Sequence, residues 1–276
     1  MKRFGLIGYP IAHSLSPFLF KAGYEGKYPY ELIETSDFEE AYSRFISEYH
    51  GINVTAPFKE LAYAKADILS EECKLIKATN LLINSPEGVK AYNSDFLGVR
   101  LWIQEVIDSS KENPIALIVG CGGAGKAAAI AAASLGMKVI LMNRDRSKAE
   151  VISDSIASME DCPEAEIRSL EEFPACFRRA DIIIYNIPTA IPALDRMTDN
   201  DFQGETAGKG EYQSKHILEA NYKNPSFTDD FISKAVKANP KASFTEGRTW
   251  LLYQAVTGYE IFTGEKPDLA SMSAVL

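Results

Sequence analysis

The sequence predicts an α/β fold in two domains, and three observations lead to this expectation. The chain has 276 residues, more than one average domain and fewer than three. Short apolar runs alternate with helical segments along its length, a pattern typical of βα units. A strong apolar run at 115–119 leads directly into a glycine-rich turn and an alanine-rich helix. We expect strands at 3–8, 30–34, 51–55, 80–84, 115–120, 138–143, 182–186 and 216–220.

The segments between these strands include two clear helices and two polar stretches. Helices are expected at 17–24, which opens with Pro17, and at 126–135, which is rich in alanine. The polar segment 108–114 ends in proline and reads as a surface connection between two halves of the chain. The segment 195–214 is polar and Gly-rich, and we expect a mobile loop there.

Composition limits the classes of partner. Hydrophobic residues make up 46% of the chain, but the apolar runs are shorter than the roughly 18 residues of a membrane span. The net charge of −9 is spread without a basic cluster, which argues against nucleic acid and membrane as partners. Four isolated cysteines and three histidines predict no metal site and suggest a reduced, cytoplasmic compartment. We therefore expect a soluble protein that binds a small molecule.

The glycine-rich turn is the clearest local motif. Gly120, Gly122 and Gly125 match G-x-G-x-x-G between a strand and a helix. Glycines there let a pyrophosphate approach backbone N–H groups at a helix N-terminus, where the helix dipole favours an anion. The alternative is a turn used for tight strand–helix packing alone. The setting favours dinucleotide binding.

The end of the next strand bears on the choice of cofactor. An acidic residue usually binds the ribose of NAD at this position, but the sequence has Asn143 and Arg144, with Lys148 one helical turn later. Guanidinium and ammonium groups suit the 2′-phosphate of NADP. Asp145 would repel that phosphate if its carboxylate faced the same way, which leaves NAD as an alternative. Arg144 and Lys148 could also be plain solvent-exposed charges at a helix entrance.

Polar residues in the first half stand at strand ends or helix starts. Ser14 and Ser16 precede Pro17, where they could either cap a helix or bind a carboxylate. Lys59 lies in the first turn of a predicted helix, where the dipole does not favour a cation, which hints at another use. Asp95 alone would be interpreted as a helix cap. Ligands of open α/β sheets bind at the carboxyl edge, where these residues should gather.

Taken in order, these motifs resemble the shikimate dehydrogenase family over residues 8–254. The family's patterns H-S-x-S-P, N-V-T-x-P-x-K and N-[TS]-D-x-x-G appear closely at 13–17, 53–59 and 93–98. Its glycine loop at 120–124, its cofactor strand end at 143–145 and its late glutamine motif at 246–254 match more loosely.

The resemblance implies an NADP-dependent shikimate dehydrogenase that reversibly reduces 3-dehydroshikimate to shikimate in aromatic amino acid biosynthesis. It implies two αβα domains, of which the N-terminal substrate domain has a mostly parallel sheet and the other is a Rossmann-type NADP domain. The substrate domain would be discontinuous, with 1–98 and 248–276 in one domain and 99–247 in the other. A monomer or homodimer without metal is expected.

The resemblance also assigns roles to residues. Lys59 and Asp95 are the implied catalytic pair, since a ketone that accepts hydride needs a nearby positive charge and then a proton. The implied substrate-binding residues are Ser14, Ser16, Thr55, Asn80, Tyr222 and Gln254. The implied cofactor-binding residues are Glu71, Gly120, Gly122, Gly123, Ala124, Asn143, Arg144, Lys148, Asn186 and Gly247.

Departures from the family pattern leave two alternatives. The family usually has threonine or serine at Asp145, aspartate at Glu219 and Glu246, and methionine at Trp250. An NAD-preferring quinate/shikimate dehydrogenase, or a sensor that binds shikimate without catalysis, would fit the same architecture. The presence of both Lys59 and Asp95 argues against the sensor.

Overall fold

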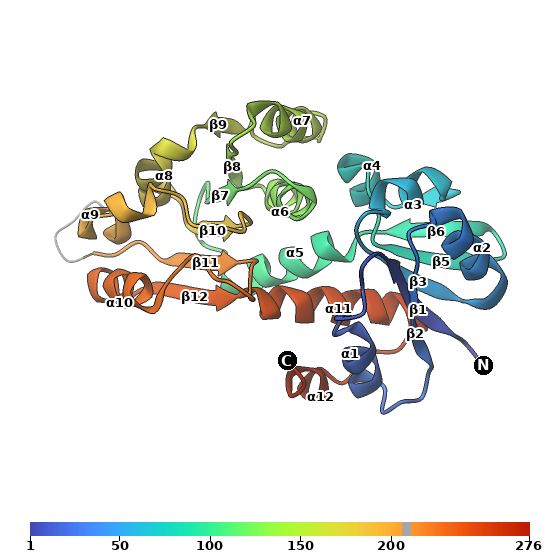
Figure 1. Cartoon of the computed structure of the whole chain (residues 1–276). Helices are drawn as coiled ribbons and strands as arrows, with labels where there is room; N and C mark the ends of the chain where they lie inside the picture. The colour runs from blue at the N-terminus through green and yellow to red at the C-terminus, as the bar shows by residue number, and fades with distance from the viewer. Residues whose placement is uncertain (206–210) are drawn as a thin grey trace. The chain divides into compact units, whose positions relative to one another are not determined.

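The computed structural model describes residues 1–205 and 211–276, which form two compact units. The first unit comprises Met1–Gly98 and Leu251–Leu276, and the second comprises Val99–Trp250. Both are labelled by element in Figure 1. Among the described residues, no helix has the length and apolar character needed to cross a membrane.

The first unit is built on a mixed sheet with strand order β2-β1-β3-β5-β6-β4. Strands β1, β2 and β3 are parallel, whereas β5 runs antiparallel to β3 and β6. Its strands are β1 (Phe4–Gly8), β2 (Tyr30–Glu34), β3 (Gly51–Val54), β4 (Ile68–Leu69), β5 (Leu81–Ser85) and β6 (Gly88–Tyr92). Its helices are α1 (Ser16–Gly23), α2 (Phe38–Glu48), α3 (Lys59–Lys65), α4 (Glu71–Ile76), most of α11 (Gly247–Thr263), and α12 (Leu269–Ser273), with the start of α5 (Ser94–Val106).

Apolar side chains cover both faces of this sheet, which makes the unit a three-layer αβα domain. Phe45 of α2, Ala62 of α3 and Cys73 of α4 belong to the core on one face. Phe20 of α1 and Tyr259 of α11 belong to the core on the other. Both cores place buried residues of the strands under helices, as the apolar strand runs predict.

The second unit contains, in the described residues, a six-stranded sheet of order β12-β11-β10-β7-β8-β9 whose neighbouring strands are all parallel. This is the doubly wound Rossmann order. Its strands are β7 (Ile115–Val119), β8 (Lys138–Met142), β9 (Glu166–Arg168), β10 (Ile182–Tyr185), β11 (Lys215–Glu219) and β12 (Ala242–Glu246). Its helices are α6 (Gly123–Ser134), α7 (Arg146–Ala157), α8 (Phe173–Arg179), α9 (Asp199–Gln203) and α10 (Asp229–Ala238), with short 3-10 turns at η1 (Leu170–Glu172) and η2 (Leu194–Arg196).

Alternate residues of the strands divide the second core into two faces. Leu117, Ile183 and Ile217 pack with Phe177 of α8 and Ala235 of α10 on one face. Figure 1 shows α8, α9 and α10 along that side of the sheet and α6 and α7 along the other. The small alanines at 127–129 and 131–133 of α6 are buried, which lets that helix approach the strands closely.

All eight expected strands are present, with ends shifted by about one residue, but four strands were not expected. These are β4, β6, β9 and β12, which are two to five residues long and carry half-exposed positions. Short strands with polar residues give no clear apolar run, because neighbouring strands rather than burial on both faces hold them in place.

Two expectations about connecting segments are wrong. The segment 108–114 lies inside the second unit, and the boundary between units falls within α5 instead. The described part of the segment 195–214 is not a loop throughout, because it contains α9 and most of η2, and Thr198 and Asp201 form a capping box. Residues 206–210 lie outside the described residues.

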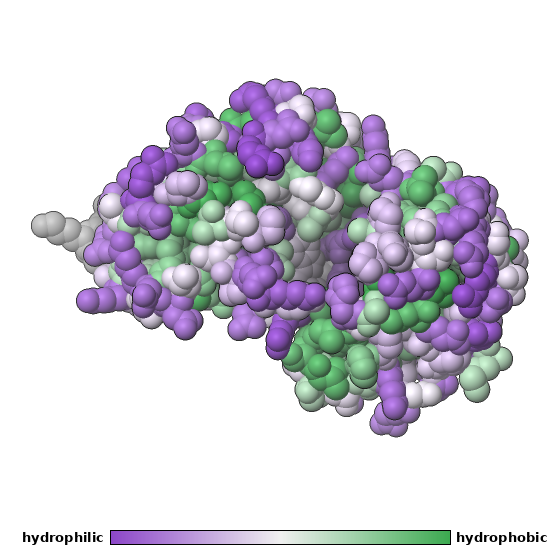
Figure 2. Space-filling model, viewed as in Figure 1, coloured by the Kyte–Doolittle hydropathy of each residue, from purple (hydrophilic) through white to green (hydrophobic). Residues whose placement is uncertain are grey.

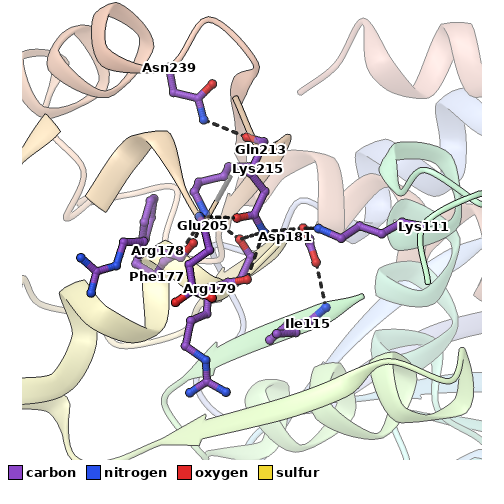
Figure 3. Close-up of polar contacts among 11 residues, drawn as sticks. Lys111, Ile115, Phe177, Arg178, Arg179, Asp181, Glu205, Gln213, Lys215 and Asn239 are labelled. Atoms are coloured by element: carbon purple, nitrogen blue, oxygen red, sulfur yellow. Dashed lines mark hydrogen bonds and ion pairs between the residues drawn. The ribbon is translucent and has the colours of Figure 1, made fainter. Parts of the chain in front are cut away.

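A polar cluster joins the amino ends of three strands in the second unit (Figure 3). The Lys215 side chain is fully buried, and its Nζ donates to the carbonyls of Phe177, Arg178 and Ala180 at 2.8–2.9 Å. The buried Asp181 carboxylate accepts from Lys111 and from the Ile115 backbone at the start of β7. The cluster therefore closes the C-terminal end of α8 and lies at the opposite edge of the sheet from the glycine turn.

The face of the molecule in Figure 2 is mostly hydrophilic, with several smaller hydrophobic areas. One of these areas lies where Figure 1 places α1 and α12 of the first unit. The exposed apolar residues of these two helices include Phe18, which is 64% exposed, and Leu269, which is 46% exposed.

Candidate active site

The predicted substrate residues of the first unit gather at one edge of its sheet. Strands β1, β3 and β6 all end at this edge, and the antiparallel β5 begins there. Ser14 and Ser16 follow β1, Lys59 follows β3, Asp95 follows β6, and Asn80 directly precedes β5. The order and direction of the strands thus bring together residues that are far apart in the sequence.

Lys59 and Asp95 form the central contact of this edge. The Lys59 Nζ lies 2.6 Å from Asp95 Oδ2, and the two side chains are 30% and 15% exposed. The backbone of Lys59 is also held, because its carbonyl accepts from the Thr79 N–H at 3.1 Å. This partly buried pair is a charge-assisted hydrogen bond in which Lys59 is the more exposed partner.

Two asparagines hold the first turn of α5, which carries Asp95. The buried Asn80 accepts from the Ser94 N–H at 2.7 Å and from the Ser94 hydroxyl at 3.2 Å. Asn93 accepts from the Phe96 N–H at 3.1 Å, which makes Asn93 the cap of the helix. The interpretation of Asp95 as a simple cap is therefore wrong. Asparagine is a common N-cap residue, so Asn93 at the predicted helix start was the signal that could have identified the cap.

The two serines do not act as ordinary helix caps. In the described residues, the N-cap position of α1 is Leu15, which makes no side-chain cap hydrogen bond. Ser14 donates to the Ser16 hydroxyl at 3.1 Å, and the Ser16 N–H donates to Ser14 at 3.3 Å. The buried Tyr259 hydroxyl donates to the Ser16 carbonyl at 3.1 Å and ties this turn to α11. The pair forms a small hydroxyl cluster beside a helix N-terminus.

Gln254 reaches the same region because α5 and α11 approach closely. A Cβ atom on Gly98 would lie 2.5 Å from the Gln254 backbone nitrogen. Glycine is therefore required at position 98, one turn after Asp95, for Gln254 to lie beside α5.

Thr55 stands between β3 and Lys59, and its backbone N–H donates to the Ile7 carbonyl at 3.0 Å.

The predicted cofactor residues of the second unit lie at the carboxyl edge of its sheet. The strand order reverses between β7 and β10, and Gly120 and Asn186 directly follow these two strands. Gly120 has φ +95°, a conformation that favours glycine, and a Cβ on Gly125 would lie 1.8 Å from the Gly120 carbonyl oxygen. In α/β sheets, ligands bind at such a reversal.

Two observations at this edge fit a bound dinucleotide. In the described chain, Cβ atoms on Gly122 or Gly123 would meet nothing within 4 Å, so the first turn of α6, including Ala124, has open space before it. The Asn186 Oδ1 is buried, and the described residues offer it no hydrogen-bond partner. A helix N-terminus with open space suits a pyrophosphate, and an unpaired amide oxygen suits a donor of the ligand.

The end of β8 clarifies the role of Asp145. Its carboxylate accepts from the Ser147 N–H at 3.1 Å and the Ser147 hydroxyl at 2.7 Å, and so caps α7. These hydrogen bonds hold the pKa of Asp145 below its usual range. Arg144 and Lys148 are exposed near the same helix start. Asn143 accepts from the Cys121 N–H at 3.1 Å and thereby joins this turn to the glycine loop.

Glu71 and Tyr222 belong to a different unit from the other residues of their predicted groups, and Gly247 directly follows β12 at the carboxyl edge of the second sheet. Glu71 belongs to the first unit, and its side chain is 85% exposed and pairs with Lys74 at 2.6 Å. Tyr222 and Gly247 belong to the second unit, where both line a pocket of about 600 Å³ at the ends of β11 and β12.

The fold and its two polar edges define the class of protein, a two-domain dehydrogenase of the Rossmann type. A family model described as "Shikimate dehydrogenase substrate binding domain" matches residues 6–82. Shikimate dehydrogenase (NADP(+)) of Acinetobacter baumannii (strain AYE) is 31% identical over 278 residues, covering 97% of this chain and 98% of that protein. The chain therefore belongs to the shikimate dehydrogenase family.

Solved structures agree on the fold. The crystal structure of Mycobacterium tuberculosis shikimate dehydrogenase has a TM-score of 0.79 at 25% identity and covers 100% of this chain and 98% of that chain. Quinate dehydrogenase from Corynebacterium glutamicum, in complex with NAD, has a TM-score of 0.82 at 20% identity. That alignment covers 99% of this chain and 98% of that chain, and shows a shared fold.

Proposed function

We propose that this protein is an NADP-dependent shikimate dehydrogenase that reversibly reduces 3-dehydroshikimate to shikimate. The observation that carries the proposal is the 2.6 Å contact between Lys59 and Asp95 at the carboxyl edge of the first sheet. The relatives named NADP(+) shikimate dehydrogenase support it. The proposed active site is the group of residues around this pair.

The chemistry of the pair fits a ketone–alcohol conversion. NADPH supplies the hydride when it is bound. Reduction leaves negative charge on the former ketone oxygen, which the Lys59 ammonium would stabilise and then protonate. Asp95 would orient the ammonium and accept a hydrogen bond from the substrate hydroxyl. In the reverse direction the pair would take the proton from that hydroxyl.

The remaining residues of the edge would hold the substrate. The hydroxyls of Ser14 and Ser16 would donate to the carboxylate, beside the N-terminus of α1. Thr55, Asn80, Gln254 and Tyr222 would contact the ring hydroxyls. Such positioning lowers the barrier by orienting the reacting carbon.

The second unit would bind NADP. The pyrophosphate would lie at the N-terminus of α6 against Gly120 to Ala124, and Arg144 and Lys148 would hold the 2′-phosphate. The Asp145 carboxylate caps α7, which gives Asp145 a structural role at this helix start that does not require it to bind a ribose hydroxyl. Glu71, Asn143, Asn186 and Gly247 would complete the cofactor site.

A steady-state assay tests the proposal. The purified protein is given shikimate with NADP or with NAD, and the reduced cofactor is followed by absorbance; quinate serves as the alternative substrate. We expect turnover of shikimate with NADP and a much lower kcat/KM with NAD. Absence of turnover, with shikimate bound in calorimetry, would instead identify a sensor.

We also propose a cytoplasmic location and a monomer or homodimer. The four cysteines are unpaired, which supports a reducing compartment. Sedimentation equilibrium of the purified chain distinguishes the two oligomeric states, and a larger particle would contradict both.

A further inference from the structure

Helix α4 begins at the same sheet edge as α5, and this places a carboxylate of α4 beside the residue that precedes α5. Strands β4 and β6 are parallel neighbours, with Leu69 paired to Ala91. Because parallel strands end at the same edge, the helices that follow them start side by side. Glu72 lies in the first turn of α4, and Asn93 directly precedes α5.

The Glu72 carboxylate bridges these two helix starts. Its Oε1 accepts from the Asn93 backbone N–H at 3.2 Å and from the Ser70 hydroxyl at 2.6 Å. Ser70 is itself fixed, because its N–H donates to the Ala91 carbonyl at 3.1 Å. A short chain of hydrogen bonds thus connects the end of β6 through Ser70 and Glu72 to Asn93.

We propose that Glu72 is a positioning residue for Asp95, an inference that rests on the proposed function. Glu72 holds the backbone of Asn93, Asn93 caps α5 through the Phe96 N–H, and Asp95 lies between them in the first turn. Asp95 therefore depends on the α4 carboxylate for the placement of its backbone. The residue lies outside every motif that the sequence displays, and only the pairing of β4 with β6 reveals it.

The chemistry of Glu72 suits this role. An ionised carboxylate accepts hydrogen bonds and donates none, so both donors can share one oxygen. It also lies near the N-terminus of α5, where the helix dipole favours negative charge. Loss of this acceptor would let Asn93, which joins β6 to α5, move together with Asp95. A displacement of about 1 Å at a catalytic group can lower the rate about 100-fold.

The test compares two substitutions at the same position. Glu72→Ala removes the acceptor, whereas Glu72→Gln keeps an amide oxygen that can accept from Asn93. We expect Glu72→Ala to lower kcat about tenfold, with the KM for NADP within about twofold of wild type, and Glu72→Gln to restore most of the activity. Glu87→Ala is the control, because Glu87 is exposed, lies in the turn between β5 and β6 and pairs with Lys90.

Two outcomes would overturn the positioning role. If Glu72→Ala unfolds at a lower temperature but keeps the wild-type kcat, the contact is structural alone. If Gln and Ala lower kcat equally, the charge matters and the hydrogen bond does not. Should Glu72→Ala fail to fold, Ser70→Ala carries the test, because it removes the donor that orients the carboxylate; a several-fold lower kcat supports the proposal and an unchanged kcat refutes it.

A readout independent of activity separates this inference from the proposed function. Hydrogen exchange of the Asn93 amide should become faster in Glu72→Ala and stay near wild type in Glu72→Gln and Glu87→Ala. Unchanged exchange in Glu72→Ala would refute the contact itself. A wild-type protein that does not oxidise shikimate would refute the proposed function while leaving the exchange result to judge the contact.

Discussion

Gly98 and Gln254 are so close that a Cβ atom on Gly98 would also lie 2.8 Å from the Gln254 Cα. The contact joins the second turn of α5 to α11 within the first unit, although the two residues lie in distant parts of the chain. The glycine of the N-[TS]-D-x-x-G pattern therefore has a packing role that the sequence does not reveal.

Replacing this glycine should disturb both packing and the site. Gly98→Ala forces α5 and α11 apart, and we expect a loss of about 1–3 kcal/mol in the free energy of unfolding together with a higher KM for shikimate. Urea unfolding and steady-state kinetics measure the two effects. Arg100→Ala, on the same helix, should change stability by less than about 0.5 kcal/mol. A wild-type KM in Gly98→Ala would show that Gln254 does not contact the substrate.

The proposed catalytic pair is tested by removing its cation. Lys59→Ala should lower kcat by about 100-fold to 10,000-fold, because both the positive charge and the proton donor are lost. The fold and the binding of shikimate should be largely retained, as circular dichroism and calorimetry would show. Lys65→Ala, at the other end of α3, serves as the control. Turnover of Lys59→Ala at the wild-type rate would refute the role.

Cofactor preference is tested at the end of β8. Arg144→Ala combined with Lys148→Ala should raise the KM for NADP by about 10-fold to 100-fold, because two charge-assisted contacts to the 2′-phosphate are lost. The KM for NAD, which has no such phosphate, should change little. Lys138→Ala, at the opposite end of the same strand, should affect neither cofactor. Equal effects on NADP and NAD would contradict the assignment.

The buried Lys215 predicts a rise in stability with pH. Burial lowers its pKa from 10.5 to about 7. Below pH 7 Lys215 is protonated in both the folded and the unfolded protein, so the cost of burying its charge fully reduces the stability of the folded protein. As the pH rises from about 7 towards 10.5, the unfolded chain keeps the proton and the folded chain loses it, so the free energy of unfolding increases.

Substitution of Lys215 isolates this effect. Lys215→Met should be destabilised at every pH, since three carbonyls of the α8 end lose their donor, and it should lack the rise seen in the wild type. Urea unfolding at several pH values measures the difference, with the exposed Lys237→Met as the control. A difference between wild type and Lys215→Met that stays constant with pH would show that the ammonium remains charged in the folded protein.

The sequence by itself determined the α/β class and most of the strands, because apolar runs and a glycine turn are local signals. Gly120 and Gly125 stand after a strong strand, and the positive φ of Gly120 and the close packing of Gly125 require glycine at both positions. Lys59 and Asp95 could be named from the ordered motifs. The motifs identified these residues but said nothing of their contact.

The tertiary structure decided which residues meet. The contact between Lys59 and Asp95 follows from the antiparallel β5, which brings the ends of β3 and β6 to one edge, and β6 was not recognisable as a strand. Glu72 reaches Asn93 because the two-residue strand β4 pairs with β6. Such pairings join residues far apart in the chain, and their free energy depends on neighbours that no local stretch of sequence contains.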